Sequence, residues 1–83
     1  MNQSEFFKAA QQGAVTVEFR KINTNELRVM LCTLNRELSG NNVPEILEQR
    51  EENEHYAVWA LDKKAWRSFR VSTVERWYVS DDT

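Results

Sequence analysis

Cationic and aromatic side chains are concentrated in one short stretch, Lys-Lys-Ala-Trp-Arg-Ser-Phe-Arg at residues 63–70. Side chains of an extended strand alternate between its two faces, so Trp66 and Arg70 share one face and Phe69 lies on the other. If Phe69 faces the core, Trp66 and Arg70 point outward, beside the two lysines of the preceding turn. An exposed indole next to ammonium and guanidinium groups can stack on a nucleobase and contact phosphate, or can anchor a protein partner.

The candidate binding surface consists of this group and two arginines at its margin: Lys63, Lys64, Trp66, Arg67, Arg70, Arg28 and Arg76. A structural role is the alternative, in which Trp66 covers the core and Arg70 pairs with an acidic neighbour such as Glu75. Arg28 alternates with apolar residues, which is also typical of the solvent-facing side of a strand.

Catalysis and metal binding find little support in the residue types. His55 is the only imidazole and Cys32 the only thiol, and Cys32 lies in an apolar run typical of a buried, inert thiol. The two glycines, Gly13 and Gly40, form no glycine-rich phosphate loop, and a metal site needs more His and Cys ligands. We therefore expect no enzyme, no catalytic residue, no metal and no cofactor.

Charge is distributed unevenly along the 83 residues, whose net charge of −2 argues against nonspecific coating of nucleic acid. Residues 45–54 hold five glutamates and one arginine, whereas residues 63–77 hold five basic side chains and one glutamate. The two blocks either attract each other or face different partners. A single cysteine and the lack of an apolar run of about 20 residues indicate a cytoplasmic protein without a membrane partner.

The elements that must position these residues follow from the periodicity. Residues 4–12 predict a short helix, in which Ser4 caps the first turn, Gly13 supplies a left-handed stop, and Phe6 and Ala10 lie on an apolar stripe. Alternating apolar residues then predict five strands at about 14–22, 26–34, 55–61, 66–71 and 75–79. Because closure removes exposed strand edges, this order favours a mainly β fold, a single small five-stranded antiparallel barrel over residues 1–83 with a short N-terminal α-helix.

The same alternation predicts the core, with buried side chains at Val15, Val17, Phe19, Leu27, Val29, Leu31, Val58, Phe69, Val71 and Val74. Trp59 and Trp77 are expected to fill the barrel end or to pack beneath the helix. Strand 75–79 or strand 15–20 is expected to remain an open edge, which invites pairing with a second chain and favours a homo-oligomer.

Two stretches carry a resemblance to a known family. Residues 27–35, with the pattern R-x-M-x-C-T-L-N, and residues 58–71, with V-W-x-L-D-x-x-x-W-R-S-F-R-V, resemble small, mostly bacteriophage proteins. These are Sm-like, SH3-barrel relatives of the bacterial WYL domain. The resemblance covers roughly residues 15–77 and implies an SH3/Sm-like barrel, a phage origin and a binding role. The chain departs from its relatives at Ala60, where they often carry an acidic residue, and it lacks the Trp-Tyr-Leu triplet.

Three functions remain open at this level. The first is a phage accessory protein that binds nucleic acid, RNA or a single strand, to modulate host gene expression. The second is a module that captures a host protein, with the acidic residues 45–54 as a candidate contact. The third is a self-assembling structural protein, since barrels of this kind pair their edge strands.

Overall fold

The computed structural model describes residues 2–44 and 54–80. Its elements are α1 (Gln3–Gln12), β1 (Ala14–Arg20), β2 (Leu27–Thr33), β3 (His55–Ala60), β4 (Ala65–Arg70), the 3-10 turn η1 (Val71–Thr73) and β5 (Val74–Val79). The helix and all five strands expected from the sequence are therefore present. Of the acidic stretch at residues 45–54, only Glu54 lies within the described part. Among the described residues, no helix has the length and apolar character needed to cross a membrane.

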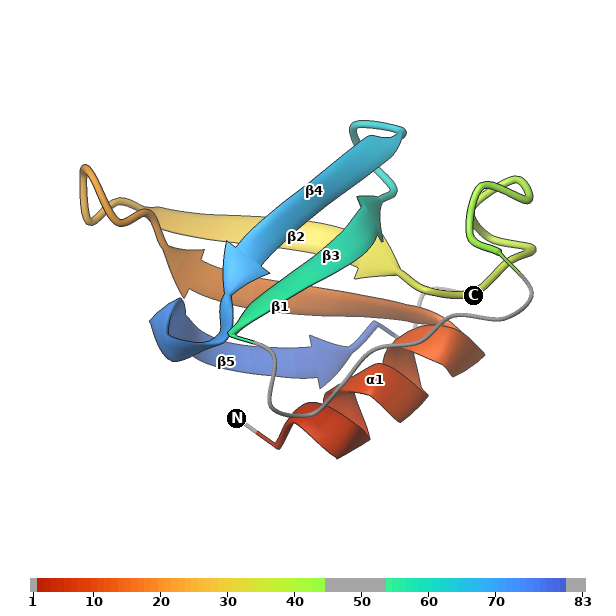
Figure 1. The fold of residues 1–83 in the computed structure, drawn as a ribbon, viewed down its shortest axis with the longest axis horizontal. Coiled ribbons are helices and arrows are strands. Elements are labelled where there is room, and N and C mark those ends of the chain that lie inside the picture. The colour runs from red at the N-terminus through yellow and green to blue at the C-terminus, as the bar shows by residue number, and fades with distance from the viewer. Residues whose placement is uncertain (1, 45–53, 81–83) are drawn as a thin grey trace.

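All five strands belong to one antiparallel sheet with the order β4-β3-β2-β1-β5. Strands β2 and β3 share only two paired positions, Cys32 with Ala60 and Thr33 with Trp59. The β3–β4 hairpin therefore swings away and crosses over the β1–β2 hairpin (Figure 1). The mainly β class with an N-terminal helix is confirmed, whereas the sheet is open and closure into a barrel stays a prediction.

The sheet order also decides which strands are edges. Strand β5 is an edge, as expected for residues 75–79, and β4 forms the other edge. The other alternative, an open edge at residues 15–20, is not observed, because β1 is paired on both sides, with β2 and with β5.

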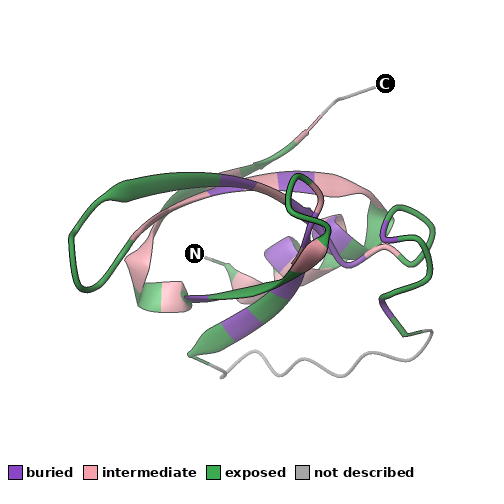
Figure 2. Ribbon diagram, turned by 90° about the horizontal axis from the view of Figure 1, so that it is seen from above, coloured by how far each residue is buried: buried purple, intermediate pink, exposed green. Residues whose placement is uncertain are grey.

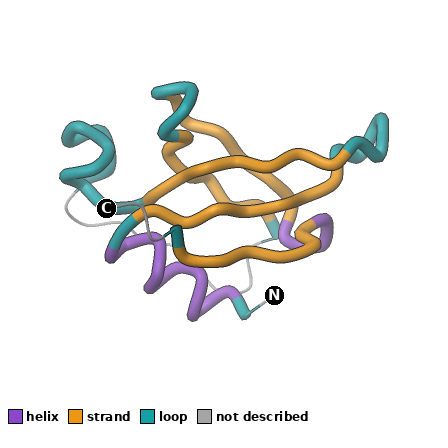
Figure 3. The backbone as a smooth tube through the Cα atoms, turned by 180° about the vertical axis from the view of Figure 1, so that it is seen from behind, coloured by secondary structure: helices purple, strands orange, loops and turns teal. Residues whose placement is uncertain are grey.

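Helix α1 begins earlier than Ser4 suggests. Asn2 is the N-cap, and its side-chain oxygen accepts a hydrogen bond from the Glu5 backbone N–H at 3.1 Å. Gly13 ends the helix in an extended conformation, with φ −177°, and not in the left-handed one. Its N–H donates to the Ala9 carbonyl, so the helix passes directly into β1 (Figure 3).

The helix covers one end of the bent sheet. Phe6 and Ala10 of its apolar stripe are fully buried. The Phe6 ring packs edge-on against Phe69 at 5.8 Å and against Trp77 at 5.4 Å between ring centroids. Trp77 thus lies beneath the helix, as expected. Through Phe6, α1 packs against both β4 and β5.

Strand β2 presents the opposite face from the one predicted. Leu27 and Val29 are exposed, at 40% and 59%, and Leu31 is only half-buried, whereas Met30 and Cys32 are buried. Residues opposite each other in an antiparallel ladder share a face, and buried Val17 and Val15 pair with Met30 and Cys32. The even-numbered residues of β2 therefore face the core, and three of the predicted core positions are wrong.

Four of the remaining core predictions are confirmed and three are met only in part; Figure 2 shows how burial is distributed over the fold. Val15, Val17, Val58 and Phe69 are buried. Three others are partly buried and pack against the core from its margin: Phe19, Val71 and Val74. Tyr56, which the prediction omitted, is among the largest fully buried side chains.

Candidate binding site

The outward face of the β3–β4 hairpin carries an aromatic pair. Trp59 and Trp66 are directly opposite in the ladder, and their rings meet edge-on at 5.8 Å between centroids. Trp66 is 40% exposed, while Phe69 on the other face of β4 is buried. The predicted orientation of β4 is therefore confirmed, but Trp59 supports Trp66 from outside the core and does not fill the end of the sheet.

Two of the other side chains on this surface are short. The surface, which we call the outer face, is formed by His55, Ala57, Trp59, Trp66, Ser68 and Arg70. Ala57 and Ser68 are opposite each other next to the tryptophan pair, and both are exposed. Beyond them His55 is opposite Arg70. Two short side chains thus separate an exposed indole from a guanidinium group, which leaves a flat strip of sheet between them.

The turn between β3 and β4 exposes two lysines. Lys64 has φ +51°, and its N–H donates to the Ala60 carbonyl at 2.8 Å, which closes the turn. Lys63 precedes it, and both side chains are exposed. The turn therefore places two ammonium groups at the end of the hairpin where the tryptophan pair lies.

Arg67 lies on the other face of β4 from Trp66, and it lines a pocket of about 640 Å³ between the two hairpins. We call this the cationic pocket, because four basic side chains line it: Lys21, Arg28, Lys63 and Arg67. Two acidic side chains, Glu26 and Asp62, line it as well, and Phe19 and Met30 supply apolar surface. The basic groups come from three separate segments of the chain.

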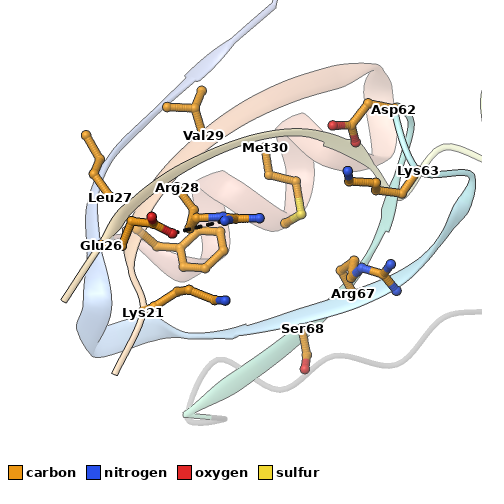
Figure 4. Close-up of a pocket in the computed structure, with 11 residues that line it drawn as sticks. Lys21, Glu26, Leu27, Arg28, Val29, Met30, Asp62, Lys63, Arg67 and Ser68 are labelled. Atoms are coloured by element: carbon orange, nitrogen blue, oxygen red, sulfur yellow. Dashed lines mark hydrogen bonds and ion pairs between the residues drawn. The ribbon is translucent and has the colours of Figure 1, made fainter. Parts of the chain in front are cut away.

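The charged groups in the pocket are only partly paired. Lys21, Arg28 and Lys63 extend toward the space between the hairpins, whereas Leu27 and Val29 point away from it (Figure 4). Arg28 Nη1 pairs with Glu26 Oε1 at 3.0 Å. No ion pair is recorded within the described part of the chain for the other three cations of the pocket: Lys21, Lys63 and Arg67.

The side chains that share the inward face of each strand, here called its row, explain why basic residues lie close together at the pocket. The inward-facing row of β1 runs Val15, Val17, Phe19 and continues to Lys21 beyond the strand. The row of β2 begins at Arg28 before it reaches Met30, and the row of β4 includes Arg67 before Phe69. The rows of β1 and β2 are apolar toward the core and basic at the end of the sheet away from α1, and the row of β4 carries Arg67 between Ala65 and Phe69.

Sequence reasoning missed Lys21, although extending the alternation of β1 by one step beyond Phe19 identifies it. The alternative in which Arg70 pairs with Glu75 is not observed, because Glu75 pairs with Arg20 at 3.1 Å.

The structure divides the predicted surface into three parts. Arg28, Lys63 and Arg67 line the cationic pocket. Trp66 and Arg70 lie on the outer face, with Lys64 at the adjacent turn. Arg76 is separate, since it lies on β5 and pairs with Glu18 at 3.4 Å.

The only thiol of the chain, Cys32, lies outside this surface, and its only imidazole, His55, lies at the margin. Burial raises the pKa of the Cys32 thiol to about 12, and the charge of Asp62 adds to the effect. The thiol is therefore protonated at neutral pH and is a poor nucleophile. His55 is exposed at the far end of the outer face. No three His, Cys, Asp or Glu side chains cluster as metal ligands among the residues that the structure describes.

Comparisons of the chain with protein-family models, with curated proteins and with solved structures found no match. The similarity to small phage proteins related to the WYL domain therefore stays a prediction, and the argument for function depends on the geometry of this chain.

Proposed function

We propose that the protein is a non-catalytic module that binds single-stranded nucleic acid on its β3–β4 hairpin. The proposal depends on one observation about β4. One face of this strand carries the exposed indole of Trp66, packed against Trp59, and both faces carry basic side chains. Trp59 and Trp66 meet at nearly a right angle, so at least one face of the Trp66 ring is not covered by Trp59, and Trp66 is 40% exposed. Stacking on an aromatic side chain contributes about 1–3 kcal/mol per base in single-strand binding.

The charge around β4 suits a phosphate backbone even though the chain as a whole is acidic. Residues 62–70 carry four basic side chains against the single carboxylate of Asp62. Because β4 is an edge strand, a ligand beside it reaches the outer face and the cationic pocket from the same side. The net charge of −2 limits binding elsewhere on the molecule, which favours a local site over a nonspecific coating.

Fluorescence anisotropy with a labelled ten-nucleotide RNA and the matching single-stranded DNA, measured at several salt concentrations, tests this proposal. Replacing Lys63 and Lys64 with Gln should lower the salt slope by about 1.4, since each phosphate contact contributes about 0.7 for a single strand. Trp66→Ala should weaken binding by about 1–3 kcal/mol with little change in slope, because stacking releases no counterions.

The matched control for the lysines is Lys8→Gln. Lys8 is exposed on α1, which contributes no residue to the lining of the cationic pocket, and its loss should leave both affinity and slope unchanged. Absence of binding by the parent protein to either oligonucleotide at about 50 mM salt would refute the proposal.

Capture of a protein partner is the second candidate, and exposed apolar side chains favour it. Leu27 and Val29 project outward from β2 beside the stretch of that strand that has no pairing recorded with β3. Binding of a protein partner at this site should persist after nuclease treatment and should be lost in the Val29→Asp variant.

Self-assembly is a third candidate. It is favoured by exposed Tyr78 and Val79 on the edge strand β5. Light scattering that returns a mass near 9.8 kDa at high concentration would exclude it. A role in modulating host gene expression follows from the phage resemblance alone and stays a prediction.

A further inference from the structure

The cationic pocket has the size and lining of a site for one nucleotide. Its volume of about 640 Å³ lies within the range of about 300–1,000 Å³ typical of small-ligand sites. Phe19 and Met30 line it from the side of the hydrophobic core, where the Phe19 ring stacks on that of Phe69 at 5.7 Å between centroids. An aromatic base fits against apolar surface of this kind.

The charge of the pocket matches a phosphomonoester better than a phosphodiester. Four basic and two acidic side chains line it, which leaves a surplus of two positive charges. A phosphomonoester carries about −1.5 to −2 at pH 7, whereas a diester within a strand carries −1. Arg67 lines the pocket with a planar guanidinium, the group that recognises phosphate oxygens; its Nη1 donates to the Trp66 carbonyl at 3.1 Å, which leaves its other N–H groups for a ligand. Lys21 and Lys63 supply point charges from the two hairpins.

We infer that the cationic pocket binds a nucleotide through a terminal phosphomonoester, supplied by the phosphorylated end of a strand or by a free nucleoside monophosphate. This inference rests on the proposed nucleic-acid binding and names the ligand of one part of the same surface. The phosphate lies among Lys21, Lys63 and Arg67, and the base lies against Phe19 and Met30. Asp62 and the Glu26 carboxylate oxygen that does not pair with Arg28 accept hydrogen bonds from ribose hydroxyls.

The test compares ten-nucleotide RNAs that differ only at their ends: 5′-phosphate, 3′-phosphate and hydroxyl at both ends. One phosphorylated form should bind about tenfold more tightly than the hydroxyl form, the gain expected for a charge-assisted hydrogen bond. AMP and UMP are titrated separately by isothermal calorimetry, with inorganic phosphate at the same concentrations as a third probe. A preference for the phosphorylated RNA over the mononucleotides assigns the strand end. Binding of the mononucleotides with no effect of end phosphorylation assigns the free nucleotide.

Variants separate the pocket from the outer face. Arg67→Gln and Lys21→Gln should each abolish the preference for the phosphorylated end or the binding of AMP and UMP. Trp66→Ala should weaken all RNAs about equally and preserve the preference. The matched controls are Arg36→Gln and Lys8→Gln, because both residues are exposed and lie outside the pocket.

The outcomes for the two proposals are distinguishable. Equal binding of all three RNAs, with no binding of AMP or UMP, would overturn the pocket inference and leave the hairpin proposal intact. Binding of AMP or UMP without binding of hydroxyl-ended RNA would refute the hairpin proposal and support the pocket. Inorganic phosphate that binds as tightly as the mononucleotides would overturn the assignment of a nucleotide.

Discussion

The register of β2 is tested by one substitution on each of its faces, Val29→Thr and Met30→Thr. Met30 is 8% exposed in the core, whereas Val29 is 59% exposed on the other side of the strand. Shortening a buried Met costs about 2–5 kcal/mol, and burying a hydroxyl without a partner adds to that cost. Met30 also lines the cationic pocket, so water can reach the new hydroxyl, and we expect a loss of about 2–3 kcal/mol.

Val29→Thr keeps the β-branched shape at an exposed position, and we expect its effect to stay within about 0.5 kcal/mol. Equilibrium unfolding in urea measures both variants. With an m-value of about 1 kcal/mol/M for so small a domain, Met30→Thr should lower the midpoint by about 2–3 M and Val29→Thr by about 0.5 M or less. A larger loss for Val29→Thr than for Met30→Thr would show that β2 presents its odd-numbered residues to the core and would refute the register.

Three further results are expected. Phe69→Ala should destabilise the fold by about 3–5 kcal/mol in urea, because Phe69 contacts the rings of Phe6, Phe19 and Tyr56; a loss below about 1 kcal/mol would contradict that packing. Cys32, whose pKa is raised to about 12 by burial, should resist a thiol reagent at pH 8 and react once urea unfolds the chain; rapid labelling of the native protein would contradict its burial. The hydrogen bonds from Ser72 to Glu54 lower the pKa of that carboxyl. Their stabilising effect is therefore present above the unfolded pKa of about 4.3 and lost as the pH falls through the folded pKa. Ser72→Ala should raise the pKa of Glu54 in an NMR titration and reduce stability at pH 7 but not at pH 2; an unchanged pKa would refute the assignment.

The elements were predictable because their signals are local. A change from helical to two-residue periodicity near Gly13, and turn residues near Asn25 and Lys64, mark where strands begin and end. Asn25 and Lys64 both adopt positive φ, at +57° and +51°, as tight turns require. The face of β4 was also predictable, since Phe69 and Trp66 lie on opposite sides of a strand with clear alternation.

The face of β2 was not predictable in the same way. Residues 29–32 are apolar on both faces, so alternation does not distinguish Val29 from Met30. The choice is made by pairing with β1, which places Met30 opposite Val17, and that is a nonlocal contact. The same error placed Arg28, a named member of the candidate surface, on the solvent-facing side of its strand, whereas in the structure it lines the cationic pocket.

The candidate site was predictable as a set of residues but not as an arrangement. Lys63, Lys64, Trp66 and Arg70 are close together in the chain, and the structure keeps them close on the hairpin. Lys21 joins Arg67 only because the two hairpins cross, which depends on the short pairing between β2 and β3. Local sequence patterns do not predict the angle at which two hairpins cross.

An NMR titration of isotope-labelled protein with a ten-nucleotide single-stranded RNA tests the central claim most directly. The account predicts that the backbone amides of residues 63–70 and the indole N–H of Trp66 shift most, followed by the amides of Lys21 and Arg28. The amides of α1 should remain unchanged, because the helix covers the end of the sheet away from the cationic pocket. Shifts confined to α1 and β5, or no shifts at saturating RNA, would contradict the account.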